Sequence, residues 1–295
     1  MIPQNRLFFI IMALAYTYAV NGQGPPSTSI SLFTFDPDET EVVSSPKYLT
    51  SFNPDGYNNQ PAFFEDDILY ITSDWEAKGQ TDILKLDLKS ESLLKVTDSE
   101  YSEYSPTPTP DNKGISCIAV PPGQSDNPTQ WLWKYPINRE NSGSAISYDF
   151  ENVGYHHWIS DHQVAIFLVG DPHSLIIYNT DNGDITEVDK NVGRCFRMDQ
   201  LGRLIYVHKA AHNIWYMKTF EVATGKKSII GETKTGSEDF EVLTDGRMVM
   251  GQGSKLFIFG EIGGWSEIAD LNKFKVKNIS RLAIRNNKIA IVHAS

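Results

Sequence analysis

The sequence is poor in cysteine, has no basic cluster and contains only one long apolar run. Its two cysteines, Cys117 and Cys195, exclude a disulfide-rich scaffold and a zinc finger, which need several ligands at close spacing. The formal net charge of −11 repels phosphate backbones, so we expect no nucleic-acid partner. What is left is an acidic globular chain with 40% hydrophobic and 12% aromatic residues, a composition that favours β structure.

Enzyme signatures are also absent. The chain has no G-x-S-x-G nucleophile elbow, Walker loop, H-E-x-x-H helix or dinucleotide-binding fingerprint. Paired carboxylates can be recognised only in space. The sequence therefore leaves catalysis undecided, but it favours a non-catalytic protein without a cofactor.

The single apolar run lies at the N-terminus and predicts a signal peptide. Arg6 supplies a positive start, and the run that follows it is too short for a membrane span of roughly 20 residues. Small residues allow cleavage before Gln23, and cleavage after Ala19 is the alternative. We therefore predict a signal peptide over residues 1–22 and one domain over 23–295, secreted or periplasmic and monomeric. No cysteine follows the run, so no bacterial lipid anchor is indicated.

One unit recurs along the rest of the chain. In its clearest copy, Pro61–Phe64 is followed by an acidic turn, by the apolar strand Ile68–Ile71, and by two further strands. The third strand, Ile83–Leu88, alternates with period two, as a strand with two different faces does. The second strands of the six copies begin at Ile68, Ile115, Val164, Leu204, Met248 and Ile289. Spacings from 40 residues (164 to 204) to 49 residues (115 to 164) predict β-propeller blades.

The two ends of the chain predict the number of blades. The last copy contains only two strands, and residues 30–35 near the N-terminus supply an additional third strand that precedes a fourth. Five whole copies and one shared copy make six blades. We therefore predict an all-β fold, a six-bladed β-propeller with four antiparallel strands per blade. N- and C-terminal strands would close the last blade and leave no open sheet edge.

Two segments resemble a known family. Residues 105–115 (SPTPTPDNKGI) resemble the SPxxSPDGKxIAF repeat of TolB-type propellers, also described as WD40-like or PD40 repeats. Residues 81–97 are similar to the DIWVMDL…RRLT segment of the same family. The resemblance implies six blades and, often, an exported protein whose central face holds a peptide or carbohydrate. TolB itself carries an extra N-terminal domain that has no counterpart in this sequence.

Aromatic and imidazole residues fall in segments that we expect on one face of the propeller. In an antiparallel blade, the connection between strands two and three and the link to the next blade emerge on the same face. These segments contain Trp75, His156, His157, Trp158, His173, His208 and His212. Such side chains suit sugar stacking, peptide contacts or a divalent metal. We predict these seven as ligand-binding residues over the central opening and assign no catalytic residue and no metal ligand.

Two functions of different class fit this face. The leading hypothesis is an exported binding or scaffolding module that recognises a protein, peptide or carbohydrate. The alternative is a metal-assisted carbohydrate-active enzyme, because some relatives with this repeat resemble polysaccharide lyases. In that case His173, His208 and His212 would hold the cation, and Arg194 or Arg197 would be the base or a carboxylate clamp.

The two cysteines are predicted to be separate thiols. Cys117 lies among apolar residues of a second strand, whereas Cys195 enters an innermost strand two blades later. A disulfide between them is the alternative, because the sequence does not show how close their Cα atoms lie.

Overall fold

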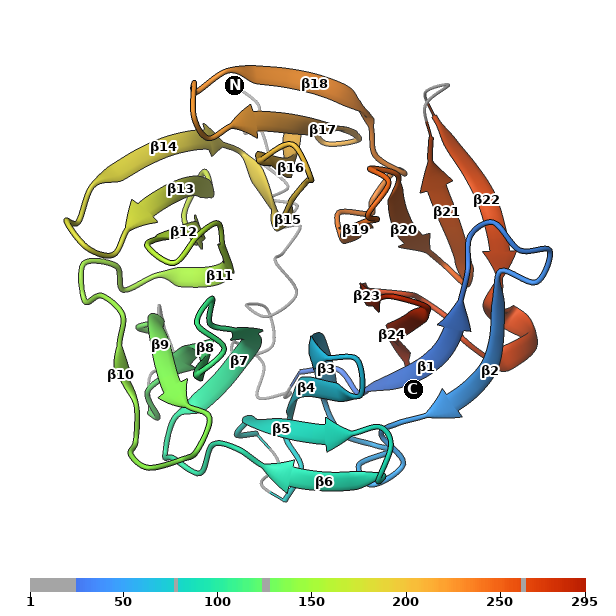
Figure 1. Ribbon diagram of the computed structural model, residues 1–295, viewed down its shortest axis with the longest axis horizontal. Helices are drawn as coiled ribbons and strands as arrows, with labels where there is room; N and C mark the ends of the chain where they lie inside the picture. The colour runs from blue at the N-terminus through green and yellow to red at the C-terminus, as the bar shows by residue number, and fades with distance from the viewer. Residues whose placement is uncertain (1–24, 77–78, 124–127, 261–263) are drawn as a thin grey trace, which may run out of the picture.

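The computed structural model describes residues 25–76, 79–123, 128–260 and 264–295, so the predicted signal peptide (1–22) lies outside the described residues. The strands form six four-stranded sheets that stand in a closed ring (Figure 1). This confirms the predicted six-bladed all-β propeller. A short 3-10 helix, η2 (Leu271–Phe274), links the last two blades. Within the described ranges no helix has the length and apolarity needed to cross a bilayer.

Five blades are built from four consecutive strands each. From the centre outwards these are β3 (Asn58–Glu65), β4 (Ile68–Ser73), β5 (Asp82–Asp87) and β6 (Ser92–Lys95); β7 (Ser102–Pro108), β8 (Gly114–Val120), β9 (Trp131–Pro136) and β10 (Ser144–Ala145); β11 (Val153–Trp158), β12 (Gln163–Leu168), β13 (Ser174–Asn179) and β14 (Ile185–Lys190); β15 (Val192–Met198), β16 (Arg203–Ala211), β17 (Ile214–Glu221) and β18 (Lys227–Glu232); and β19 (Phe240–Val242), β20 (Met248–Gln252), β21 (Lys255–Phe259) and β22 (Trp265–Asp270). The predicted second strands therefore begin within one residue of the observed ones.

The sixth blade joins the two ends of the chain. It consists of β23 (Arg281–Arg285), β24 (Lys288–Ala294), β1 (Thr28–Phe35) and β2 (Val43–Tyr48). β1 runs antiparallel to β24, with Ile30 opposite Val292 and Phe33 opposite Ile289. This confirms that N- and C-terminal strands close the last blade. Because this pairing closes the ring, no blade junction is left open.

The core lies between the blades rather than at the centre of the ring. In the described part of the chain, each of the six junctions between neighbouring blades holds a hydrophobic cluster. On β16, Leu204 and Tyr206 pack towards the preceding blade, whereas Ile205 and Val207 pack towards the following one. A second strand is therefore buried on both sides, which explains why these strands are continuously apolar instead of alternating.

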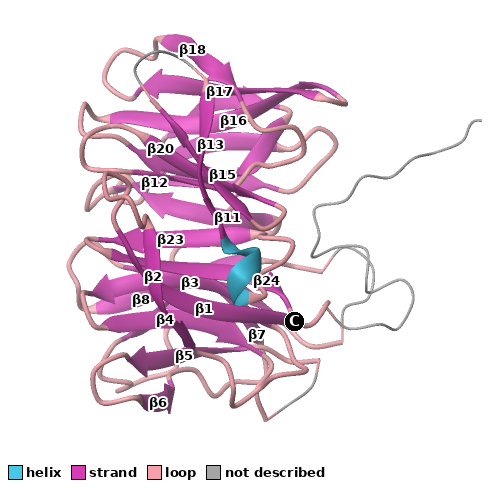
Figure 2. Ribbon diagram, turned by 90° about the vertical axis from the view of Figure 1, so that its right-hand side faces the viewer, coloured by secondary structure: helices cyan, strands magenta, loops and turns pink. Residues whose placement is uncertain are grey.

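The strand order gives the disc two different faces (Figure 2). The turns between strands one and two and between strands three and four lie on one face, here called the turn face. The connections between strands two and three and the links between blades lie on the other, at which the innermost strands begin. We call this second face the entry face; the C-terminal end of β24 lies on it (Figure 2, right).

The cysteines are separate, as predicted. Cys117 on β8 and Cys195 on β15 are both free and buried. The Cys195 thiol donates to the carbonyl oxygen of Phe240 at 3.3 Å and accepts from the Phe240 amide at 3.4 Å. It therefore connects two adjacent innermost strands, β15 and β19, and burial raises its pKa to about 12.

Candidate functional site

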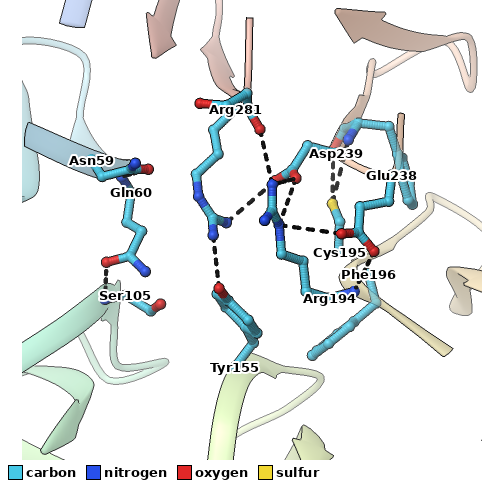
Figure 3. Close-up of polar contacts among 12 residues, drawn as sticks. Asn59, Gln60, Ser105, Tyr155, Arg194, Cys195, Phe196, Glu238, Asp239 and Arg281 are labelled. Carbon is cyan, nitrogen blue, oxygen red and sulfur yellow. Dashed lines mark hydrogen bonds and ion pairs between the residues drawn. The ribbon is translucent and has the colours of Figure 1, made fainter. Parts of the chain in front are cut away.

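A cavity of about 270 Å³ lies at the centre of the ring, lined by all six innermost strands. Each of these strands, or the residue directly before it, contributes a polar side chain to the cavity wall, and Figure 3 shows these residues facing one another. We call this set the polar ring; its members are Gln60, Ser105, Tyr155, Arg194, Asp239 and Arg281. One site is thus assembled from all six blades.

Local backbone irregularities help to turn these side chains inwards. The pairing between the first and second strands is interrupted by a bulge on β3, β7, β11 and β15. Gln60 and Ser105 lie within such bulges with φ values of 54° and 56°, and each precedes a proline. A bulge leaves an extra residue unpaired and redirects its side chain, here towards the cavity.

Four members of the ring form a connected charged network. Asp239 accepts from Arg194 Nε at 2.9 Å and from Arg194 Nη2 at 2.6 Å, and its other oxygen accepts from Arg281 Nη1 at 3.3 Å. Arg281 Nη2 donates to the Tyr155 hydroxyl at 2.8 Å (Figure 3). Burial by itself would raise the pKa of Asp239, but Arg194 and Arg281 hold it below its ordinary value of 3.8.

A second layer of charged side chains continues along the cavity towards the turn face. Arg197 donates to Glu241 Oε1 from Nε at 3.0 Å and from Nη2 at 2.7 Å. The Arg197 side chain is 30% exposed, against 10% for Arg194. Burial, reinforced by Arg197 and His156, lowers the pKa of the neighbouring His157 to about 3. His157 is therefore neutral at physiological pH and adds no charge to the cavity.

The remaining two members of the polar ring, Gln60 and Ser105, are uncharged. The side of the cavity opposite the charged network is therefore neutral. Gln60 Oε1 accepts from the Ser105 amide at 2.9 Å. The Ser105 hydroxyl is buried and has no hydrogen-bond partner among the described residues. Apolar residues complete the wall, among them Pro61, Ala62 and Pro108. The side chains of the lining residues Phe63, Phe196, Leu282 and Ile284 pack into the clusters between blades.

The seven ligand-binding residues predicted from the sequence fall into two groups, those that lie on the innermost strand β11 and those that lie away from the cavity. Of these, His156 and His157 line the cavity. The expectation that they and Trp158 lie in a link on the entry face is wrong, because all three form the second half of β11 and lead to the turn face. His156 Nε2 pairs with Ser116 Oγ at 2.7 Å, and the Trp158 indole donates to the same oxygen at 2.9 Å. These two side chains thus connect neighbouring blades.

The other four lie on the entry face but away from the cavity wall. Trp75 packs edge-to-face on Phe52, with ring centroids 5.5 Å apart, and covers the core of a blade junction. His173 accepts from the Gly170 amide at 3.1 Å. His208 Nδ1 lies 3.4 Å from Asp189, and His212 is exposed in the turn after β16. The loops therefore do not converge on the axis as predicted, because second and third strands stand outside the innermost strand.

The imidazoles proposed as metal ligands do not form a group. In residues 25–76, 79–123, 128–260 and 264–295, no three His, Cys, Asp or Glu side chains gather closely enough to hold a metal ion. Of the candidates for the enzymatic alternative, Arg194 and Arg197 do line the cavity, each bound to a carboxylate.

The sequence analysis did not predict Glu241 or these five members of the polar ring: Gln60, Ser105, Tyr155, Asp239 and Arg281. One positional signal marks the ring residues, since each precedes the start of its second strand by eight to ten residues, as Arg281 precedes Ile289 by eight. Residue type does not mark them, because the six positions hold six side chains of five different kinds, whereas histidine and tryptophan stand out in the loops.

Comparison with known proteins finds solved structures with the same fold. No protein-family profile and no curated protein sequence matches the chain. TolB from Acinetobacter baumannii superposes on 95% of this chain and 67% of its own, with a TM-score of 0.59 and 14% identity. A candidate TolB from Agrobacterium tumefaciens superposes on 92% of this chain and 99% of its own, with a TM-score of 0.67 and 11% identity. The chain therefore has the fold of TolB-type propellers.

Enzymes share this fold. Oligogalacturonate lyase in complex with manganese superposes on 85% of this chain and 80% of its own, with a TM-score of 0.58 and 14% identity. At such low identity the similarity shows only that the blades are arranged alike. The function of this chain therefore depends on its own side chains.

Proposed function

We propose that this TolB-like propeller is an exported binding module that takes a segment of its partner into the central cavity. The observation that carries the proposal is the convergence of one polar side chain from each of six blades on one cavity. Concave, largely pre-formed sites with a few convergent polar groups are where proteins bind ligands. Rigid strands hold these side chains, so binding requires no large rearrangement.

A cavity-filling variant tests the proposal. Peptide libraries displayed with free N- or free C-termini, together with glycan arrays, supply ligands of the wild-type protein. Ala62→Trp places an indole in the cavity, which Ala62 lines. Leu201→Trp is the matched control, because Leu201 is 75% exposed on the turn face. We expect Ala62→Trp to weaken binding at least about tenfold, or 1.4 kcal/mol, and Leu201→Trp to leave it unchanged.

Wild-type affinity in folded Ala62→Trp protein would contradict the proposal, since the partner would then bind elsewhere. Export has a separate test. When the whole chain is produced in a secreting host, N-terminal sequencing of the released protein should begin at Gln23, or at Val20 for the alternative cleavage. Retention of Met1 in released protein would remove the basis for the signal peptide.

A further inference from the structure

The arginines of the cavity have more hydrogen-bond donors than the protein uses. A guanidinium carries five N–H donors. Among the described residues, Arg194 and Arg197 each make three hydrogen bonds through their guanidinium groups, and Arg281 makes two. None of these guanidinium nitrogens is a closed-off donor without a partner among the described residues, so the remaining N–H groups are accessible from the cavity and are free to bind an acceptor there.

The charges around the cavity also do not cancel. Asp239 is shared between Arg194 and Arg281, Glu241 pairs with Arg197, and Glu238 pairs with Lys209 at 2.8 Å. Four cations therefore face three carboxylates. Arg285, which also lines the cavity, is paired with Asp66 outside it. One positive charge is left over at the centre of a chain whose formal charge is −11, and it matches a single negative charge on a ligand.

The neutral side of the cavity offers different contacts. The Ser105 hydroxyl has no partner among the described residues, and no hydrogen bond is formed there by Gln60 Nε2. The Gln60 side-chain amide can donate to the C=O of a peptide bond, and the Ser105 hydroxyl, which is closed to solvent in this conformation, can reach the peptide N–H after rotation about its Cα–Cβ bond. The apolar residues beside them that line the cavity, Pro61, Ala62 and Pro108, suit an apolar side chain. About 270 Å³ is small for a ligand pocket and holds a chain end rather than a long segment.

We infer that the group bound in the cavity is the free C-terminal carboxylate of a peptide that ends in an apolar residue. This inference rests on the proposed function and narrows it to one kind of partner. The carboxylate accepts from the unused N–H groups of Arg197 and Arg194, in the two-pronged geometry that guanidinium groups favour. The last peptide bond meets Gln60 and Ser105, and the last side chain lies on the apolar wall.

The test compares an acid with its amide. Isothermal titration of the wild-type protein with N-acetyl-alanyl-leucine and with N-acetyl-alanyl-leucinamide should show at least about tenfold tighter binding of the acid, because a hydrogen bond to a charged group is worth about 1.5–3 kcal/mol. Arg197→Ala should abolish this preference, and Arg197→Lys should restore part of it. Arg203→Ala, which removes an arginine paired with Asp199 on the turn face, should keep it in full.

Three results would overturn the inference. They are equal affinity for acid and amide, tighter binding of glucuronate than of the peptide acid, and no binding of any probe to the wild-type protein. The test is separable from that of the proposed function. A selected partner that loses affinity in Ala62→Trp but binds equally well as acid and amide would keep the cavity as the site and refute its preference for a carboxylate.

Discussion

The two sides of the polar ring occupy equivalent positions of the repeat but differ in chemistry. Four adjacent blades contribute Tyr155, Arg194, Asp239 and Arg281, which are bound to one another in one network. The other two blades contribute Gln60 and Ser105, which keep unused polar groups. The propeller fold thus determines where a side chain lies, whereas the residue at that position determines whether it holds the ring together or is available to a ligand.

The acidic side chains of the two sides also differ in their titration. Asp239 lies between two arginines and has a lowered pKa. Glu103, on β7 two residues before Ser105, is buried with one oxygen unpartnered among the described residues. Burial, reinforced by Asp82, raises the pKa of Glu103 to about 7, although hydrogen bonds from Ser99 and Tyr135 oppose this. The two sides therefore respond to pH in opposite directions.

The largest effect is expected from breaking the charged network. Asp239→Ala leaves Arg194 and Arg281, whose side chains are largely buried, without their shared counter-charge. Removing one partner of a buried ion pair costs about 3–5 kcal/mol, so the free energy of unfolding in urea should fall by that amount. A loss below about 1 kcal/mol would mean that water solvates both arginines and that this side of the ring is not a structural unit.

The next largest effect concerns pH. Because the folded-state pKa of Glu103 lies above its ordinary value of 4.5, the stabilisation is complete below that value and is lost as the pH rises through about 7. Buried His156 and His157, whose pKa values are lowered to about 3, stabilise the fold in the opposite direction as the pH rises, so the comparison is made with Glu103→Gln. In urea titrations, the free energy of unfolding of the wild-type protein relative to Glu103→Gln should decrease by the order of 3 kcal/mol between pH 5 and pH 8. A difference that stays constant over this range would contradict the assignment to Glu103.

Asp239 changes the pH dependence of the free energy of unfolding in the opposite direction to Glu103. Its lowered pKa means that its contribution is present above pH 3.8 and is lost as the pH falls below that value. In Glu103→Gln protein, the free energy of unfolding should therefore fall as the pH drops below 6.5, where unfolding lets His156 and His157 take up protons, and should fall further below pH 3.8 as Asp239 is protonated.

A smaller effect is expected outside the ring, at Trp75. Because this side chain packs on Phe52 and covers a blade junction, Trp75→Ala should lower the free energy of unfolding by about 2 kcal/mol. Its effect on partner binding should be small, since Trp75 does not line the cavity. The reverse pattern, with binding lost and stability kept, would restore the entry-face loops as the binding site.

The smallest effect is expected at Gln60. Gln60→Ala removes one hydrogen bond, to the Ser105 amide, so stability should fall by no more than about 1 kcal/mol. Thermal melts of Gln60→Ala and Asp239→Ala measured side by side compare the two sides of the ring directly. Equal losses would remove the distinction between them.

Much of the fold could be predicted because repeats and periodicity are local signals. The second-strand starts, the pairing of the two terminal strands and the free thiol of Cys117 followed from apolar runs and from the count of copies. The site could not be predicted in the same way. Asp239 and Arg281 are 42 residues apart in sequence and meet only because their innermost strands are neighbours in the folded ring. The inward direction of Gln60 depends on a bulge that no composition signal marks.

The direct test of the central claim is to observe the cavity arginines while a ligand binds. In ¹⁵N-labelled protein, addition of N-acetyl-alanyl-leucine should shift the Nε–H resonances of Arg194 and Arg197 and leave those of Arg203 and Arg247, on the turn face, in place. The leucinamide should produce much smaller shifts of the same resonances. Shifts confined to Arg203 or Arg247, with Arg194 and Arg197 unmoved, would contradict a binding site at the centre of the ring.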